Sequence, residues 1–188
     1  MVRADDEELT DTHMDSKLLP QVHQKLCEGA HVADVGCGSA GALAAMASAY
    51  PESRFDGYEP DPTTAERASD RIRKDNLSAR VRILNAPSGA MPERTYDFIT
   101  TVEVIHEVGD PQRVIDDIGR ALKSDGTYLM VEADVSHRLE DNLQKGKFLY
   151  SVSTMYCLPL SLAGEGAGIG LCMGEKLPRE MCARAGQH

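Results

Sequence analysis

The chain has 188 residues, a length that suits one domain with a hydrophobic core. Its composition, with 41% hydrophobic and 27% charged residues, is ordinary for a globular protein. No apolar run approaches the roughly 20 residues of a membrane span, and the acidic start lacks the parts of a secretory signal, which predicts a cytoplasmic protein without a membrane partner. The net charge of −10 disfavours nucleic acid as a partner, and five cysteines without a CxxC pair predict neither a disulfide framework nor a metal site.

The chain begins with a polar, acidic segment, residues 1–16, which we predict to be a flexible tail. A single domain over residues 17–188 follows, and its first helix ends at Gly29. We then predict strands in HVADVG, SRFDGYE, VRILNA, YDFITTVEV and TYLMVEAD, and helices in SAGALAAMASAY, DPTTAERASDRIRKDN and DPQRVIDDIGRALKSDG. Strands separated by helices pair in parallel, so the predicted fold class is α/β, a doubly wound, mostly parallel Rossmann-like sheet with helices on both faces.

The alternation of strands and helices stops after residue 134. Residues 135–175 hold helical stretches interrupted by Gly146 and Pro159 and then the glycine-rich run GEGAGIGLCMG, which predicts a helical cap and a flexible connector. A last amphipathic helix is predicted in EKLPREMCARAG. Four side chains in the cap either line a ligand pocket or, the interpretation we favour, form a helix face buried against the sheet: Tyr150, Met155, Tyr156 and Cys157.

A glycine motif joins the first predicted strand to the helix after it. Gly36, Gly38 and Gly41 satisfy G-x-G-x-x-G, which is common to sites for dinucleotides and for S-adenosylmethionine (SAM). Asp34 precedes the motif and would repel a pyrophosphate at the helix N-terminus, whereas it suits the ammonium and sulfonium groups of SAM. Charge therefore favours SAM, and an NAD-dependent oxidoreductase is the alternative that the glycines alone motivate.

Two later strand ends carry candidate nucleoside contacts. Glu59 ends the second strand, 23 positions after the first glycine, where a carboxylate accepts hydrogen bonds from ribose hydroxyls. The alternative is an exposed acid before a helix whose N-cap is Asp61. Pro60 offers an apolar surface to adenine. Asn85 and Ala86 follow the third strand, where they either contact the adenine edge or form an ordinary turn.

Four segments carry a resemblance to a known family: VADVGCGSAG, SRFDGYEPD, YDFITTVEVIHEVGDP and ALKSDGTYLMVEAD. Through them the chain, from about residue 16 onward, resembles class I SAM-dependent methyltransferases. The stretches LEDNLQKGKFLYSVSTMYCLPLSLA and GIGLCMGEKLPREMCARAG are similar to a subfamily whose longer members often carry an N-terminal winged-helix domain, for which we expect no room here. Members usually have two further strands, so the resemblance implies a seven-stranded sheet without its last two strands. The fifth strand would then be an exposed edge through which a homodimer could form.

The resemblance also assigns roles to residues. It places Asp34, Gly36, Cys37 and Gly38 around the methionine part of SAM, Glu59 at the ribose, and Asn85 and Ala86 beside the adenine. Thr101 and Val102 would offer backbone to the amino group of SAM, with Glu103 and His106 just beyond, nearest the methyl group. The family often has glycine where this chain has Ala40, and a β-carbon there would tighten the loop.

The leading hypothesis is a SAM-dependent methyltransferase acting on a small-molecule acceptor. Methyl transfer needs alignment more than acid–base chemistry, but His106 could take a proton from the acceptor and Glu103 could orient it. Packing and capping are the alternative roles for these two residues. The alternative functions are a SAM-binding regulatory or truncated module without turnover, and the NAD-dependent oxidoreductase.

Overall fold

The computed structural model describes residues 19–163 and 166–186, so the tail predicted over 1–16 lies outside the described residues. Contacts divide the chain into two compact units. The first unit runs to residue 101 and includes 120–130, and the second comprises 102–119 and the chain from 131 onward. In the described part of the chain no helix has the length and apolar character needed to cross a lipid bilayer.

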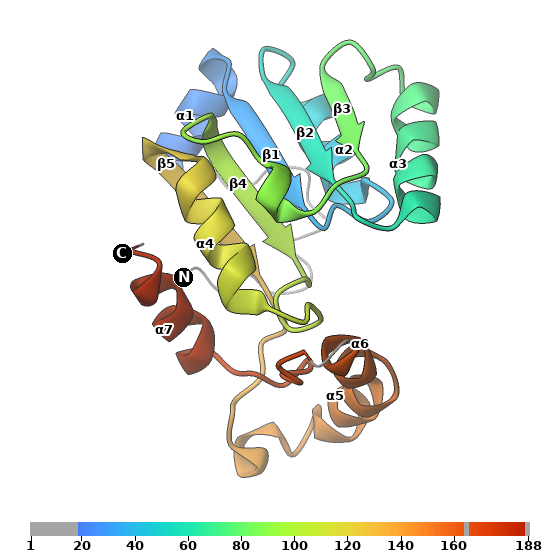
Figure 1. Ribbon diagram of the computed structural model, residues 1–188, viewed down its shortest axis with the longest axis vertical. Helices are drawn as coiled ribbons and strands as arrows, with labels where there is room; N and C mark the ends of the chain where they lie inside the picture. The colour runs from blue at the N-terminus through green and yellow to red at the C-terminus, as the bar shows by residue number, and fades with distance from the viewer. Residues whose placement is uncertain (1–18, 164–165, 187–188) are drawn as a thin grey trace. The chain divides into compact units, whose positions relative to one another are not determined.

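Within the residues that the structure describes, five strands form a single sheet in the order β3-β2-β1-β4-β5 (Figure 1). They are β1 (His31–Val35), β2 (Arg54–Tyr58), β3 (Val81–Leu84), β4 (Tyr96–Val102) and β5 (Leu122–Val131). β1 pairs in parallel with β2 and with β4, and β2 pairs in parallel with β3. This order and direction confirm the predicted Rossmann-like α/β class, because parallel neighbours need crossover connections.

Except at the end of α4, the helices of the described residues begin and end close to the predicted segments. They are α1 (Pro20–Glu28), α2 (Gly41–Ala49), α3 (Pro62–Lys74), α4 (Pro111–Ala121), α5 (Gly146–Val152), α6 (Leu158–Leu162) and α7 (Lys176–Arg184). Three short helical segments complete the described elements: η1 (Ser88–Ala90) between β3 and β4, η2 (Leu139–Asn142) between β5 and α5, and the π-helical η3 (Ser153–Cys157) between α5 and α6. Gly29 ends α1 in the left-handed conformation and Asp61 caps α3, as predicted, because each supplies a hydrogen bond that a helix end lacks.

The hydrophobic core of the first unit lies on one face of the sheet. Four strands place one buried apolar side chain each in a continuous row of register partners: Val81, Phe55, Val32 and Phe98. Side chains of α1, α2 and α3 complete the cluster, among them Leu26, Leu43 and Ile72. Removal of this apolar surface from water is the main force that holds the three helices against the sheet.

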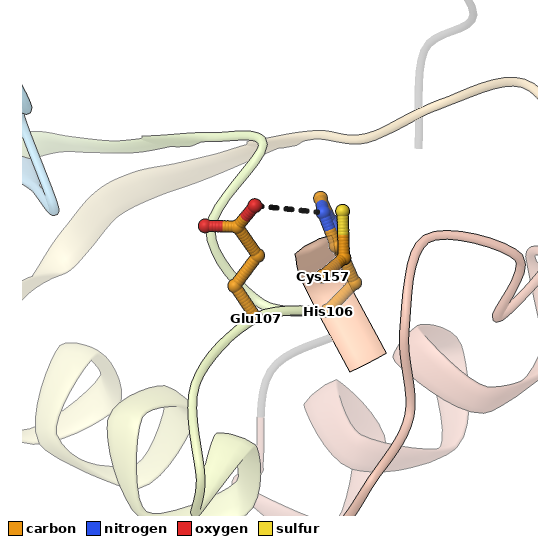
Figure 2. A group of neighbouring side chains, drawn as sticks. All are labelled: His106, Glu107 and Cys157. Carbon is orange, nitrogen blue, oxygen red and sulfur yellow. Dashed lines mark ion pairs between the residues drawn. The ribbon is translucent and has the colours of Figure 1, made fainter. Parts of the chain in front are cut away.

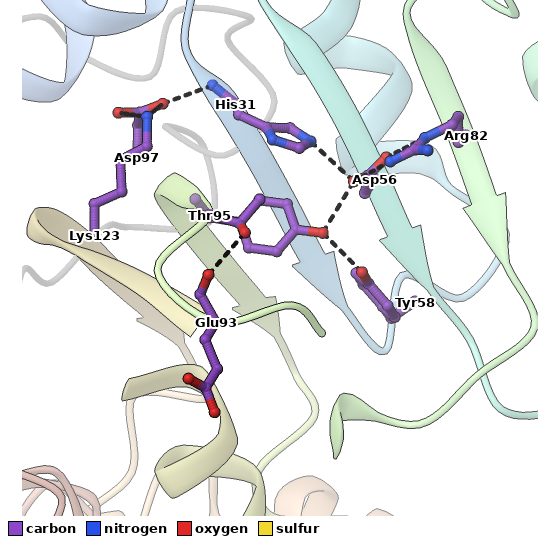
Figure 3. Close-up of polar contacts among 9 residues, drawn as sticks. His31, Asp56, Tyr58, Arg82, Glu93, Thr95, Asp97 and Lys123 are labelled. Carbon is purple, nitrogen blue, oxygen red and sulfur yellow. Dashed lines mark hydrogen bonds and ion pairs between the residues drawn. The ribbon is translucent and has the colours of Figure 1, made fainter. Parts of the chain in front are cut away.

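A buried polar network occupies another part of the first unit (Figure 3). The carboxylate of Asp56 bonds His31 at 2.9 Å, Arg82 at 2.8 Å and the Tyr96 hydroxyl at 2.9 Å. That hydroxyl also lies 2.7 Å from the hydroxyl of Tyr58. Burial opposes ionisation of Asp56, but the bonds from these partners outweigh it and hold its pKa well below the ordinary range.

The beginning of β5 differs from the prediction. The sequence predicts a helix that continues to Gly126, whereas α4 ends at Ala121 and β5 starts directly at Leu122. Lys123 forms an ion pair with Asp97 at 2.8 Å, which ties this segment to β4. Gly126 does not end a helix, and its backbone lies so close to Leu122 that a β-carbon would be 2.9 Å from the Leu122 side chain.

In the second unit, backbone hydrogen bonds hold the glycine-rich stretch in place. The amides of Ala167 and Gly170 donate to the carbonyls of Gly109 and His106, so the described part of this stretch is anchored rather than an open connector. Pro159 lies inside a continuous helical path from α5 to α6, where η3 widens the helix just before it. A proline has no amide hydrogen for the preceding turn, which explains the widening.

The cap does not bury the side chains expected of it. Cys157 is buried, but Met155 and Tyr156 are 82% and 59% exposed, so the favoured interpretation of a wholly buried face is wrong for these two. Helical spacing alone does not distinguish a covered face from an exposed one, because it gives no information about what lies opposite.

Candidate functional site

The glycine loop after β1 turns tightly over the end of β2. Gly36 and Gly38 have φ of 70° and 54°, values that favour glycine. The amides of Gly36 and Cys37 both donate to the carbonyl of Tyr58, at 2.8 and 3.1 Å. Ala40 has φ of 59° as it leads into α2, so its β-carbon is strained by roughly 1 kcal/mol at the position where the resemblance leads one to expect glycine.

The neighbouring strand leaves space for this loop at Gly57. A β-carbon on Gly57 would lie 2.8 Å from Sγ of Cys37 and 2.9 Å from the side chain of Leu43. Both distances are below any normal contact, so a larger residue at position 57 would displace the loop or α2. The conformation of the glycine loop therefore depends on a glycine that lies outside the G-x-G-x-x-G motif.

Asp34 places a carboxylate in the apolar face of the sheet. It follows the core residue Val32 by two positions, pairs with Gly57 and Thr100 across the sheet, and is only 3% exposed. Its Oδ1 accepts a hydrogen bond from Oγ1 of Thr100 at 2.8 Å. Burial raises the pKa of Asp34 to about 7, and the Thr100 bond offsets only part of that rise. A nearby cation would stabilise the ionised form.

Glu59 links the glycine loop to the segment after β2. One carboxylate oxygen accepts from the amide of Gly38 at 3.1 Å and the other from the amide of Asp61 at 3.0 Å. Asn85 donates to the carbonyls of Glu59 and Pro60, both at 2.9 Å. The structure thus brings Asp34, Gly36, Cys37, Gly38, Glu59, Pro60 and Asn85 together in the first unit, with Ala86 next to Asn85.

The remaining predicted cofactor contacts lie at the end of β4. Thr101, in the first unit, is completely buried, and its hydroxyl bonds that of Tyr128 at 2.8 Å. Val102 belongs to the second unit and is exposed.

The thiol of Cys37 lies in the glycine loop. Burial and the charges of Asp34 and Glu59 raise its pKa to about 12. This thiol is therefore neutral, not a nucleophile.

His106 is the centre of a buried polar cluster in the second unit. Its Nδ1 hydrogen-bonds Oε2 of Glu132, and the other oxygen of Glu132 accepts from the amides of Val104 and Ile105 at 3.2 and 2.7 Å. A carboxylate at Nδ1 favours a proton on that nitrogen, so in the neutral ring the lone pair lies on Nε2. Burial lowers the pKa of His106, but Glu132 and then Glu103 and Glu107 outweigh it, so the net direction is upward.

Two further groups lie beside Nε2 of His106 (Figure 2). Oε1 of Glu107 is 3.6 Å away, and the thiol of Cys157, at the end of η3, belongs to the same cluster. Burial and then Glu107 raise the pKa of Cys157 to about 11. Glu103 has φ of 56°, a strained value for a residue with a β-carbon. His106 and Glu103, the two predicted catalytic residues, therefore lie together in one strained and acidic segment.

Comparison with known proteins agrees with this geometry. Residues 33–128, from β1 to β5, match the family described as "Methyltransferase domain". The chain belongs to this family. The matched part of the methyltransferase domain contains the glycine loop, Glu59, Asn85 and the His106 segment.

Individual relatives cover part of this methyltransferase domain. A polyketide synthase of Burkholderia thailandensis is 30% identical over 54% of the chain, which spans 5% of that protein. An uncharacterised methyltransferase of Schizosaccharomyces pombe is 26% identical over 55% of the chain, which spans 40% of it. The chain therefore covers less than half the length of either relative.

Solved structures share the fold. The O-methyltransferase of a Brevibacillus brevis polyketide synthase, in complex with S-adenosylhomocysteine, is 30% identical with a TM-score of 0.50, covering 58% of this chain and 39% of that one. An O-methyltransferase family protein of Burkholderia thailandensis has a TM-score of 0.66 at 16% identity, covering 91% of this chain and 50% of that one. The second likeness concerns the fold alone.

Sequence reasoning did not identify three polar residues of these two sites. Thr100 is an unremarked threonine within an apolar strand, yet it binds Asp34. Glu132 and Glu107 lie beside His106, and neither fits a motif. A polar residue inside a predicted buried strand is the only signal available for Thr100, and for Glu132 the signal is an acid at the carboxyl end of a strand.

Proposed function

We propose that this methyltransferase domain binds SAM and transfers its methyl group to a hydroxyl group of a small-molecule acceptor. The observation that carries the proposal is Asp34, whose buried carboxylate follows the apolar row of β1 and precedes the first tight glycine turn. A negative charge there favours a cationic ligand and repels a pyrophosphate. The O-methyltransferase relative at 30% identity, which was solved with S-adenosylhomocysteine, supports the same cofactor and an oxygen acceptor.

The polar groups of the first unit support binding of a nucleoside. Each oxygen of Glu59 accepts one backbone hydrogen bond and keeps a second lone pair, so the carboxylate has capacity for two ribose hydroxyls. Asn85 holds the carbonyls of Glu59 and Pro60, and in our proposal it positions this segment while Pro60 and Ala86 flank the adenine. Thr101 and Val102 supply backbone to the amino group.

The chemical step moves one methyl group and one proton. In our proposal the acceptor oxygen attacks the methyl carbon, the carbon–sulfur bond breaks, and its electron pair stays on sulfur as S-adenosylhomocysteine forms. The hydroxyl proton goes to Nε2 of His106, whose Nδ1 is held by Glu132. His106 follows β4 by four positions, at the carboxyl end of a strand, where ligands bind in open α/β sheets. Glu103 orients the imidazole.

The test separates binding from turnover. Calorimetric titration of the purified chain with S-adenosylhomocysteine and with NAD should give heat and a raised melting temperature for the former alone. Transfer of labelled methyl from SAM to a panel of phenols, alcohols and amines then reports the acceptor atom. Absence of binding by both SAM and its product would refute the proposal, and binding without transfer to any acceptor would leave a SAM-binding module instead.

Self-association through β5 is a further part of this proposal. Among the described residues, β5 lies at one end of the strand order and has a neighbouring strand on one side only. An unpaired strand edge offers hydrogen bonds to another chain. Sedimentation at increasing protein concentration should show a dimer, and a monomer at every concentration would reject this part.

A further inference from the structure

The lone pair of His106 Nε2 lies next to two other groups that bind metal ions. One ligand atom from each of His106, Glu107 and Cys157 lies within 4.8 Å of the other two. Figure 2 shows the three side chains together, with Nε2 and Oε1 of Glu107 3.6 Å apart. Ligand atoms bound at about 2.0–2.3 Å to one tetrahedral zinc ion are about 3–4 Å apart. Small side-chain movements would therefore bring all three within range of one ion.

We propose that His106, Glu107 and Cys157 form a site for a single Zn²⁺ ion with one coordination position left open. Imidazole nitrogen, thiolate sulfur and carboxylate oxygen are the donors that zinc accepts in proteins, and the mixture suits it better than magnesium or calcium. Three protein ligands with a free fourth position are typical of zinc sites that take up water or a substrate atom. The inference does not depend on methyl transfer.

The surroundings of His106 match those of a metal-bound histidine. A histidine that binds zinc through one nitrogen usually donates its other N–H to a carboxylate, which fixes the ring and its tautomer. Glu132 plays that part at Nδ1, and the amides of Val104 and Ile105 hold the Glu132 carboxylate in place. The carbonyl of His106 accepts from the amide of Gly170 at 3.1 Å, so backbone and side chain are both fixed.

Burial and charge select the Nε2 side of the ring for the ion. A second cluster of metal-binding groups consists of Glu103, His106 and Glu132. In that cluster the Glu132 carboxylate already binds the imidazole and two backbone amides, so it supports His106 instead of binding an ion. His106 and Cys157 are 1% and 3% exposed, so their bonds to an ion would be shielded from water. The Cys157 thiolate and the Glu107 carboxylate together balance the two positive charges of zinc.

Zinc and proton transfer exclude one another at this nitrogen. Nε2 has a single lone pair, which binds either a zinc ion or a proton. In the proposed function, His106 takes up the hydroxyl proton of the methyl acceptor. Zinc bound to Nε2 would prevent this proton transfer. Zinc binding and SAM binding remain separately measurable.

The experiment uses the full chain, freed of metal by a chelator and kept reduced. Titration with Zn²⁺ against a chromophoric chelator should give one ion per chain. Co²⁺ in its place should give the near-ultraviolet absorption of a cobalt–thiolate bond. Cys157→Ser should abolish that absorption, whereas Cys172→Ser, a matched change in the same unit, should keep it. Glu107→Gln and Glu132→Gln should each weaken zinc binding by about tenfold or more.

Two results would overturn the site. The first is wild-type protein without saturable zinc binding, and the second is equal zinc affinity in the wild type, Cys157→Ser and Glu107→Gln. Stabilisation of each variant by S-adenosylhomocysteine checks that it is folded, and Glu107→Gln, a near-isosteric change of a half-buried side chain, serves where Cys157→Ser does not fold. If the wild type binds no zinc but is still stabilised by S-adenosylhomocysteine, the metal proposal alone is rejected and the proposed function is unaffected.

Discussion

Replacing Asp34 with asparagine should stabilise the ligand-free protein at alkaline pH. Burial raises the pKa of this carboxyl from its ordinary 3.8 to about 7. A folded-state pKa above the unfolded value means that the folded chain binds more protons between those two pH values, so stability falls as pH rises through this window and levels off above 7. At 1.36 kcal/mol per pH unit, the advantage of Asp34→Asn over the wild type should grow by about 3 kcal/mol between pH 5 and pH 8.

Urea unfolding of both proteins at several pH values, without ligand, measures this difference. Other carboxyl groups titrate in both proteins and cancel in the comparison. The side-chain oxygen of asparagine can still accept the bond from Thr100, so packing changes little. The same variant should bind SAM more weakly, and the wild-type dissociation constant should rise up to about tenfold per pH unit below 7, because binding must then displace a proton. A difference in unfolding free energy that does not change with pH would refute the reasoning.

Other changes test the loop and the polar network. Gly57→Ala should weaken binding of S-adenosylhomocysteine and lower stability by about 1–3 kcal/mol, because its β-carbon would lie 2.8 Å from Sγ of Cys37; calorimetric titration with unchanged affinity would contradict this. Asp56→Asn should cost about 3 kcal/mol in urea unfolding at pH 7, since it leaves His31 and Arg82 without their charged partner. The pKa of Asp56 is lowered in the folded state, so its contribution is present above the unfolded value and is lost as pH falls below about 4; an equal deficit at pH 7 and at pH 3 would be inconsistent with that origin. Tyr96→Phe should cost about 1–2 kcal/mol through its bonds to Asp56 and Tyr58, again measured by urea unfolding, and a variant as stable as the wild type would show that these bonds contribute nothing.

Local features of the fold were predictable because their causes are local. Alternation of apolar strands and helices identified β1 to β4, and single residues such as Gly29 and Asp61 marked helix ends by the hydrogen bonds they supply. The start of β5 was not predictable in this way. Its position depends on contacts such as Lys123 with Asp97, 26 residues earlier.

The same distinction between local and long-range causes applies to the residues of the candidate sites. The glycine loop and Glu59 follow from spacing within one crossover unit. Thr100 bonds Asp34 across 66 positions and Glu132 reaches His106 across 26, and both contacts require the register of neighbouring strands. Cys157 joins His106 only because η3 ends at that residue, and the π-helical turn follows from a proline two positions later. For this reason the sequence alone predicted no metal site.

Two residues around the glycine loop are poor choices for stability alone. An apolar residue at position 34 would continue the buried row of β1 without the penalty of a carboxylate in that face, and glycine at position 40 would remove the strain of a left-handed alanine. These departures lie around one turn, whereas the rows that hold Phe55 and Phe98 follow packing rules. Departures concentrated in this way are expected where a ligand supplies the missing interactions. For Asp34 the missing interaction is a positive charge, which SAM carries and a dinucleotide phosphate lacks.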